Sequence, residues 1–211
     1  MERSRNRAVR GLGGLVAVTA VLTASLAGAG GAATEAMKGT IDQVIRILQD
    51  KELKKPERRE ERRQTLEKIV AERFSYEEMA KRALAAQWKA LKDEERKEFV
   101  ELFKALLTRT YADKIESYSG EPVHYVNERL QEGYAEVRTK VVSGKAEIPL
   151  DYRMMTIGGD WRVYDVVIDG VSLVNNYRGQ FNKIIKAEGY QGLVEKLRKK
   201  SDAIEAPKTG S

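Results

Sequence analysis

The 211-residue sequence contains no cysteine and a single histidine, His124. A catalytic cysteine, a cysteine-rich zinc site and a metal site built on two histidines are therefore excluded. A serine triad would have to use His124, and the chain has no G-x-S-x-G motif to present a nucleophilic serine. Without disulfides, the stability of the fold must come from the burial of apolar groups.

Glycine-rich loops of the phosphate-binding kind are also missing from the body of the chain. The only dense glycine string, Gly11–Gly14, lies inside an N-terminal segment at positions 1–33. This segment has an arginine-rich start, an apolar run at Leu12–Leu26 and then only alanine and glycine at Ala27–Ala33. That order is typical of a secretory signal peptide, with a retained membrane anchor as the alternative. We expect cleavage between Gly30 and Thr34.

The positive charge of the chain is concentrated in that leader. Residues 1–33 hold four Arg and one Glu, so their removal lowers the net charge from +6 to +3. A mildly basic mature chain argues against nucleic-acid binding, which requires a dense basic face. The charged run at Asp50–Arg63 mixes both signs, as on a solvated helix, and a surface that docks a partner is the alternative.

Two hydrophobic periods divide the rest of the chain. Helical spacing predicts helices at 41–48, 56–70, 75–84 and 93–115, with Thr40 and Ser75 as capping residues. A period of two then predicts strands at 123–127, 135–141, 148–154 and 161–167, joined by short turns into an antiparallel meander. Helices at 173–185 and 193–197 follow.

Helices first, then a four-stranded sheet and closing helices, indicate an α+β architecture. We expect one domain at 34–200, followed by a frayed tail at 201–211.

The stretch Trp161–Phe181 is the most informative, because the apolar period changes there from two to about 3.6 across the turn Asp169-Gly170. A strand therefore leads directly into a helix that Ser172 caps. Asp165 is the one polar residue in phase with the apolar residues of the strand. It is a candidate general base, and the alternatives are a bulge position or an ion pair with Arg153 or Arg178.

The string YDVVIDGVSLVNNYR, followed by QF, resembles the signature of the MlaC family of periplasmic phospholipid carriers, also called toluene-tolerance auxiliary proteins. The resemblance continues in FSYEEMAKRAL at 74–84, in EFVELFKALLTRTYADKIESYSGE at 98–121, in VRTKVV at 137–142 and in IPLDYRM at 148–154. Residues 33–73 match the family only in their helical character.

The resemblance implies a curved four-stranded antiparallel sheet that, with several helices, encloses an apolar cavity for the acyl chains of a phospholipid. It implies a monomeric periplasmic carrier without catalysis or cofactor, whose cargo is the phospholipid. Its partners would be an inner-membrane ABC transporter complex with an MCE-domain protein and an outer-membrane lipoprotein–porin complex. This is the Mla pathway, which maintains the lipid asymmetry of the outer membrane.

Periodicity, rather than the family, supplies the candidate lipid-binding residues, and ordinary core packing is the alternative for each of them. They are Leu106, Tyr111, Val141, Ile148, Leu150, Tyr152, Trp161, Val163, Val167, Val174, Tyr177, Phe181 and Ile184.

Two other functions remain open at this stage. One is an isomerase-like enzyme on a cone-shaped sheet that uses a buried Asp, and the other is a lipid-free protein-interaction module. An enzyme needs a polar catalytic group in the cavity, and only Asp165 and the tyrosines offer one.

Overall fold

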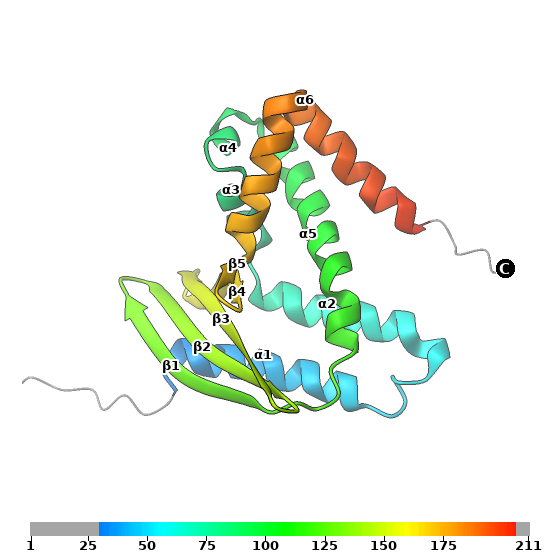
Figure 1. Ribbon diagram of the computed structural model, residues 1–211, viewed down its shortest axis with the longest axis vertical. Coiled ribbons are helices and arrows are strands. Elements are labelled where there is room, and N and C mark those ends of the chain that lie inside the picture. The colour runs from blue at the N-terminus through cyan, green and yellow to red at the C-terminus, as the bar shows by residue number, and fades with distance from the viewer. Residues whose placement is uncertain (1–29, 206–211) are drawn as a thin grey trace, which may run out of the picture.

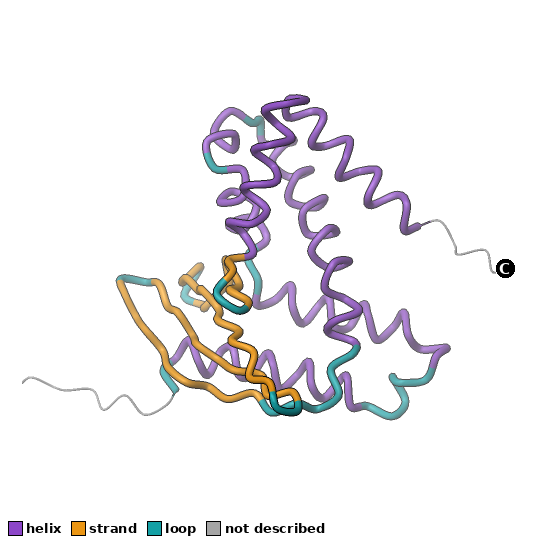
Figure 2. The backbone as a smooth tube through the Cα atoms, in the orientation of Figure 1, coloured by secondary structure: helices purple, strands orange, loops and turns teal. Residues whose placement is uncertain are grey.

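The computed structural model of this chain describes residues 30–205, and Figures 1 and 2 show its course. The predicted signal peptide up to residue 29 and the end of the predicted tail lie outside these residues. The helices are α1 (Ala32–Gln49), a short 3-10 helix (Pro56–Arg58), α2 (Arg59–Arg73), α3 (Tyr76–Leu84), α4 (Ala86–Ala90), α5 (Asp93–Glu116) and α6 (Leu173–Glu205). The strands are β1 (Val123–Gln131), β2 (Tyr134–Ser143), β3 (Ala146–Ile157), β4 (Asp160–Ile168) and β5 (Val171–Ser172).

These elements form an α+β fold, as the sequence predicts. The sheet is antiparallel, with its strands in the order β1-β2-β3-β4-β5. In Figure 1, α1 runs across the sheet, while α3, α5 and α6 stand together beyond the β4–β5 edge. The helices thus divide into a part that lies along the sheet and a bundle at one end of it.

The sheet has five strands rather than the predicted four. Asp169 and Gly170 both have positive φ angles, of 48° and 78°, which is the backbone of a tight hairpin turn. The chain therefore returns antiparallel to β4 and pairs with it through Val171 and Ser172 before α6 begins. The strand does not lead directly into the helix, because this short hairpin intervenes.

A β-bulge changes which side chains of β4 face the core. The pairing of β3 with β4 shifts between Arg153 and Met154, so β4 carries one extra residue. As a result Val166 and Ile168 share the face of Val163, which we call the inner face. Val163 and Val167, both predicted to contact lipid, therefore lie on opposite faces of the sheet, with Val167 on the outer face.

The helix boundaries confirm one predicted cap and correct another. The hydroxyl of Ser75 accepts a hydrogen bond from the backbone N–H of Glu78 at the start of α3 (3.3 Å). Thr40 is not a cap, because α1 already begins at Ala32, within the segment assigned to the leader. The two predicted C-terminal helices are the two parts of α6, which bends at Gly189, where φ is 73°.

The centre of the helical bundle is an aromatic cluster between α5 and α6. The ring centroid of Phe103 lies 5.3 Å from that of Tyr177 and 5.4 Å from that of Phe181, both edge-on. Phe99 meets Phe181 in the same manner at 5.6 Å. All four rings are buried, so close packing of aromatic side chains holds these helices together.

Candidate functional site

The inner face of the sheet is closed at one end and open at the other. From the closed end, its successive rows of paired residues are Ala135–Met154–Val163, Val137–Tyr152–Val166, Thr139–Leu150–Ile168 and Val141–Ile148. The first two rows are buried. In the third row Leu150 and Ile168 are only half-buried, and Ile148 in the last row is 41% exposed. We call the last two rows, together with Tyr125 of the neighbouring strand, the open end.

The helices carry further half-buried apolar side chains. Ile41 of α1 and Leu106 and Tyr111 of α5 pack against the buried core without being fully covered themselves. An apolar surface left partly uncovered by its own chain is suited to an apolar ligand. The open end and these helical side chains form the candidate site.

Tyrosine hydroxyls are the polar groups of this apolar region. The hydroxyl of Tyr125 is buried and has no hydrogen-bond partner among residues 30–205. Burial raises the pKa of Tyr125 to about 12, and burial also raises the pKa of Tyr111 and Tyr152. A buried hydroxyl without a partner is costly, and an acceptor atom of a ligand would relieve that cost.

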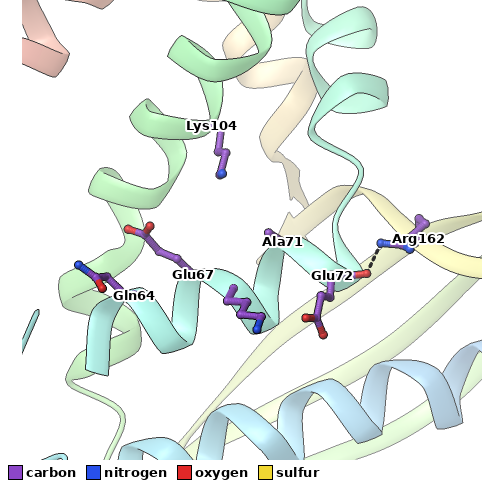
Figure 3. Close-up of a pocket in the computed structure, with 7 residues that line it drawn as sticks. Gln64, Glu67, Ala71, Glu72, Lys104 and Arg162 are labelled. Atoms are coloured by element: carbon purple, nitrogen blue, oxygen red, sulfur yellow. Dashed lines mark hydrogen bonds between the residues drawn. The ribbon is translucent and has the colours of Figure 1, made fainter. Parts of the chain in front are cut away.

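An open polar cleft of about 530 Å³ lies between α2, α5 and β4 (Figure 3). Lys104 points from α5 towards α2, and Arg162 donates a hydrogen bond to the carbonyl oxygen of Glu72. The residues that line this cleft are Gln64, Glu67, Lys68, Ala71, Glu72, Lys104 and Arg162. The charged lining does not suit acyl chains, but its cationic groups are of the kind that attract a phosphate.

A second open cleft, of about 570 Å³, lies at the start of α5 beside Trp88 and Arg96, and it is also lined mainly by charged residues.

The charged run at Asp50–Arg63 contributes an ion-pair cluster that joins α2 to α5. The carboxylate of Glu116, only 10% exposed, is paired with Arg59, Arg62 and Arg63. Burial raises the pKa of Glu116, but the hydrogen bond from Arg63 and the three positive charges outweigh that effect and lower it. Part of the run therefore holds two helices together.

Asp165 is a structural residue of the β4–α6 junction. Its buried carboxylate accepts hydrogen bonds from the hydroxyl of Ser172 (2.6 Å) and the backbone N–H of Val174 (3.0 Å), and it pairs with Arg153 (3.1 Å). Ser172 in turn accepts from the N–H of Asn175, which confirms it as a cap. The predicted ion pair with Arg153 is confirmed. A carboxylate with three partners is poorly placed to act as a base.

Asp165→Asn is expected to lower the free energy of unfolding by about 1–3 kcal/mol, because it removes the charge that Arg153 and the start of α6 require. Urea denaturation of the purified protein measures this change. Asp169→Asn, an exposed position in the adjoining turn, is the matched control and should leave stability unchanged. Equal stability of the two variants would contradict the structural role of Asp165.

The predicted lipid-binding residues separate into three groups. Those at the open end or in the row next to it are Val141, Ile148, Leu150 and Tyr152. Those at β4 and in the helical bundle, buried except for the half-buried Leu106, Tyr111, Trp161 and Ile184, are Leu106, Tyr111, Trp161, Val163, Val174, Tyr177, Phe181 and Ile184. Val167 stands apart on the outer face of the sheet.

Sequence reasoning missed three residues of the open end, Thr139, Tyr125 and Ile168. Tyr125 alternates with Val123 in the predicted first strand, and this spacing could have placed it on the same face. Ile168 could not have been found in this way, because the hydrophobic pattern does not reveal the bulge that turns its side chain to the inner face.

Two kinds of feature are missing from residues 30–205. No group of three or more His, Asp or Glu side chains there is arranged to hold a metal ion. No helix in this range is both long and apolar enough to span a membrane.

The fold and the site define a class: an α+β protein whose antiparallel sheet, with helices alongside, presents a half-open apolar surface. A sequence model of the MlaC protein family matches residues 38–199, which is most of the chain. The chain therefore belongs to the MlaC family.

Named relatives are similar to this chain at modest identity. The intermembrane phospholipid transport system binding protein MlaC of Haemophilus influenzae is 23% identical over 123 residues, covering 56% of this chain and 58% of the relative. The toluene tolerance protein ttg2D of Pseudomonas putida is 27% identical over 120 residues, covering 52% and 56%. The chain thus matches little more than half the length of these relatives.

A solved structure is similar over a greater length. It is the phospholipid-binding protein of Ralstonia solanacearum, determined in complex with a phospholipid. The TM-score is 0.71 at 26% identity, and the match covers 82% of this chain and 98% of that one.

Proposed function

We propose that this protein is a phospholipid carrier that holds acyl chains against the open end of its sheet. The observation that carries the proposal is the gradient of burial along the inner face, where apolar rows pass from fully covered to half-exposed. Family membership and the similarity to a phospholipid-binding structure support the same function. The proposal depends chiefly on three residues of the open end, Leu150, Ile168 and Tyr125.

Transfer energetics explain why such a surface is needed. At about 0.8 kcal/mol per buried methylene, one long acyl chain costs roughly 10 kcal/mol to expose to water. An apolar protein surface offsets that cost while the lipid crosses an aqueous compartment. The head group keeps its water, because only the acyl chains need to be shielded from it.

We further propose that the carrier works as a monomer in the periplasm. It exchanges lipid with an inner-membrane ABC transporter complex that has an MCE-domain protein and with an outer-membrane lipoprotein–porin complex. The name of the Haemophilus influenzae relative, an intermembrane phospholipid transport system binding protein, supports this route. Binding and release suffice for such a task, and the satisfied carboxylate of Asp165 offers no support for an enzyme.

Phospholipid should co-purify with the exported protein, in several head-group classes. Burial of acyl chains is non-directional, so a site that covers only the chains discriminates weakly between head groups. Organic extraction followed by mass spectrometry measures the amount and class of lipid per protein. The same protein after unfolding, delipidation and refolding is the control. A lipid-free native extract would favour a protein-interaction module, and a single head-group class would contradict weak discrimination.

A further inference from the structure

A glutamate from the sheet lies at the start of α1. In the register of β1 with β2, Glu128 pairs with Val137, so its side chain is on the inner face, along which α1 runs. Its Oε2 accepts hydrogen bonds from the backbone N–H (2.7 Å) and the hydroxyl (2.5 Å) of Thr34. Its Oε1 is buried and has no partner within the described part of the chain. One of the two oxygens of this carboxylate therefore accepts no hydrogen bond from the described residues.

The same carboxylate touches the residues just before Thr34. A Cβ atom at Gly31 would overlap Oε1 of Glu128, so Gly31 lies directly against the oxygen that has no partner. A second carboxylate is close, because a Cβ at Gly30 would fall 2.7 Å from Oε1 of Glu35. Neither glutamate forms an ion pair with any residue in 30–205. Two negatively charged side chains thus flank residues 30–34, and no cationic side chain within residues 30–205 is paired with either of them.

These are the residues at which the sequence predicts cleavage of the leader. Cleavage replaces an amide N–H by an α-ammonium group, which carries a positive charge and three donors at neutral pH. We propose that Glu128 binds the amino terminus of the processed chain, which begins within 31–34. Processing then completes an ion pair that anchors α1 to the edge strand β1. This inference rests on the predicted cleavage and not on the binding of lipid.

A plain helix-capping role for Glu128 is the competing explanation. A carboxylate at a helix N-terminus is stabilising through the helix dipole, and Thr34 already donates to it. Capping, however, leaves Oε1 unused, and it requires no free ammonium group. The two explanations therefore predict different effects when residues are added in front of the native start.

The test is a comparison of four proteins by thermal melting. Intact-mass measurement of the exported protein first gives the native start. Wild type and Glu128→Gln are then prepared with that start and with a short Gly-Ser extension before it. We expect the extension to lower the melting temperature of the wild type by about 2–4 °C and to leave that of Glu128→Gln unchanged. Glu136→Gln, on the outer face of β2, is the matched control and should respond to the extension as the wild type does.

Titration of the terminal amine by NMR provides a second readout. Its pKa should exceed the ordinary value of about 7.7–8.0 in the wild type and return to it in Glu128→Gln. The other titratable groups that face this position are Glu35 of α1 and Tyr125 of β1. Because the folded-state pKa is raised, the added stability should be present below the ordinary pKa and be lost as pH rises through the raised one.

Three results would overturn the proposal: a native start outside 31–34, equal effects of the extension in wild type and Glu128→Gln, or an amine pKa that the substitution does not change. Lipid content enters none of these measurements. Failure here would therefore leave the proposed carrier function intact, and a lipid-free protein would leave the ion pair intact.

Discussion

Phe181→Ala is expected to lower the free energy of unfolding by about 3–5 kcal/mol, the range for removal of a large buried aromatic side chain. Its ring is 3% exposed and lies edge-on to those of Phe99 and Phe103, so truncation leaves a cavity between α5 and α6. Urea denaturation gives the loss directly. Phe181→Leu keeps most of the volume and should cost much less.

This experiment also separates two interpretations of α6. The hydrophobic pattern placed Phe181 among lipid-contacting residues, whereas the aromatic cluster surrounds it with fixed side chains. We expect the molecules that remain folded to keep their phospholipid. A variant with native melting and no bound lipid would show instead that Phe181 lines the lipid site, as the pattern predicted.

Leu150→Gln should weaken phospholipid binding about fivefold or more, and so lower the phospholipid bound per protein, while the melting temperature stays close to native. Leu150 is half-buried at the open end, between Thr139 and Ile168. In the lipid-free protein water can hydrogen-bond to a side-chain amide at this position, but acyl chains that cover it leave it unpaired, at a cost of about 1–3 kcal/mol. Each 1.4 kcal/mol of that cost weakens lipid binding about tenfold. Quantitative lipid extraction and thermal melting of the same preparation provide both numbers.

Ile157→Gln is the control for this prediction. It makes a similar change on the same strand, at an exposed position next to the hairpin that leads to β4. Its lipid content should equal that of the wild type. If Leu150→Gln also keeps all its lipid, the open end is not where the acyl chains lie, and the proposed site is wrong.

Local features of the chain were predictable because they depend on residues close together in sequence. The cap at Ser75, the meander of strands and the long helix that starts at Asp93 each follow from spacing and turn chemistry within about a dozen residues. The extra strand at Val171–Ser172 was missed, because two residues are too few to show a period. The start of α1 was missed because the alanines Ala32 and Ala33 suit both a leader boundary and a helix.

The candidate site was predictable only in part, and the reason is geometric. Periodicity identifies which residues share a face of one element, so Leu150 and Tyr152 were found. It does not say what lies opposite that face. Tyr177 and Phe181 have the same helical spacing whether they contact a ligand or the aromatic rings of α5. Only the close packing of α6 against α5 shows that they contact those rings.

The sequence by itself determined the chemistry that this protein lacks, its α+β class and its family membership, because these depend on residue types and their local order. The tertiary structure alone decided where the inner face is left open, which residues the bulge in β4 turns inward, and which carboxylate meets the start of α1. Glu128 and Thr34 are 94 positions apart. Contacts of this kind depend on how strands align and helices dock, which spacing within one segment does not encode.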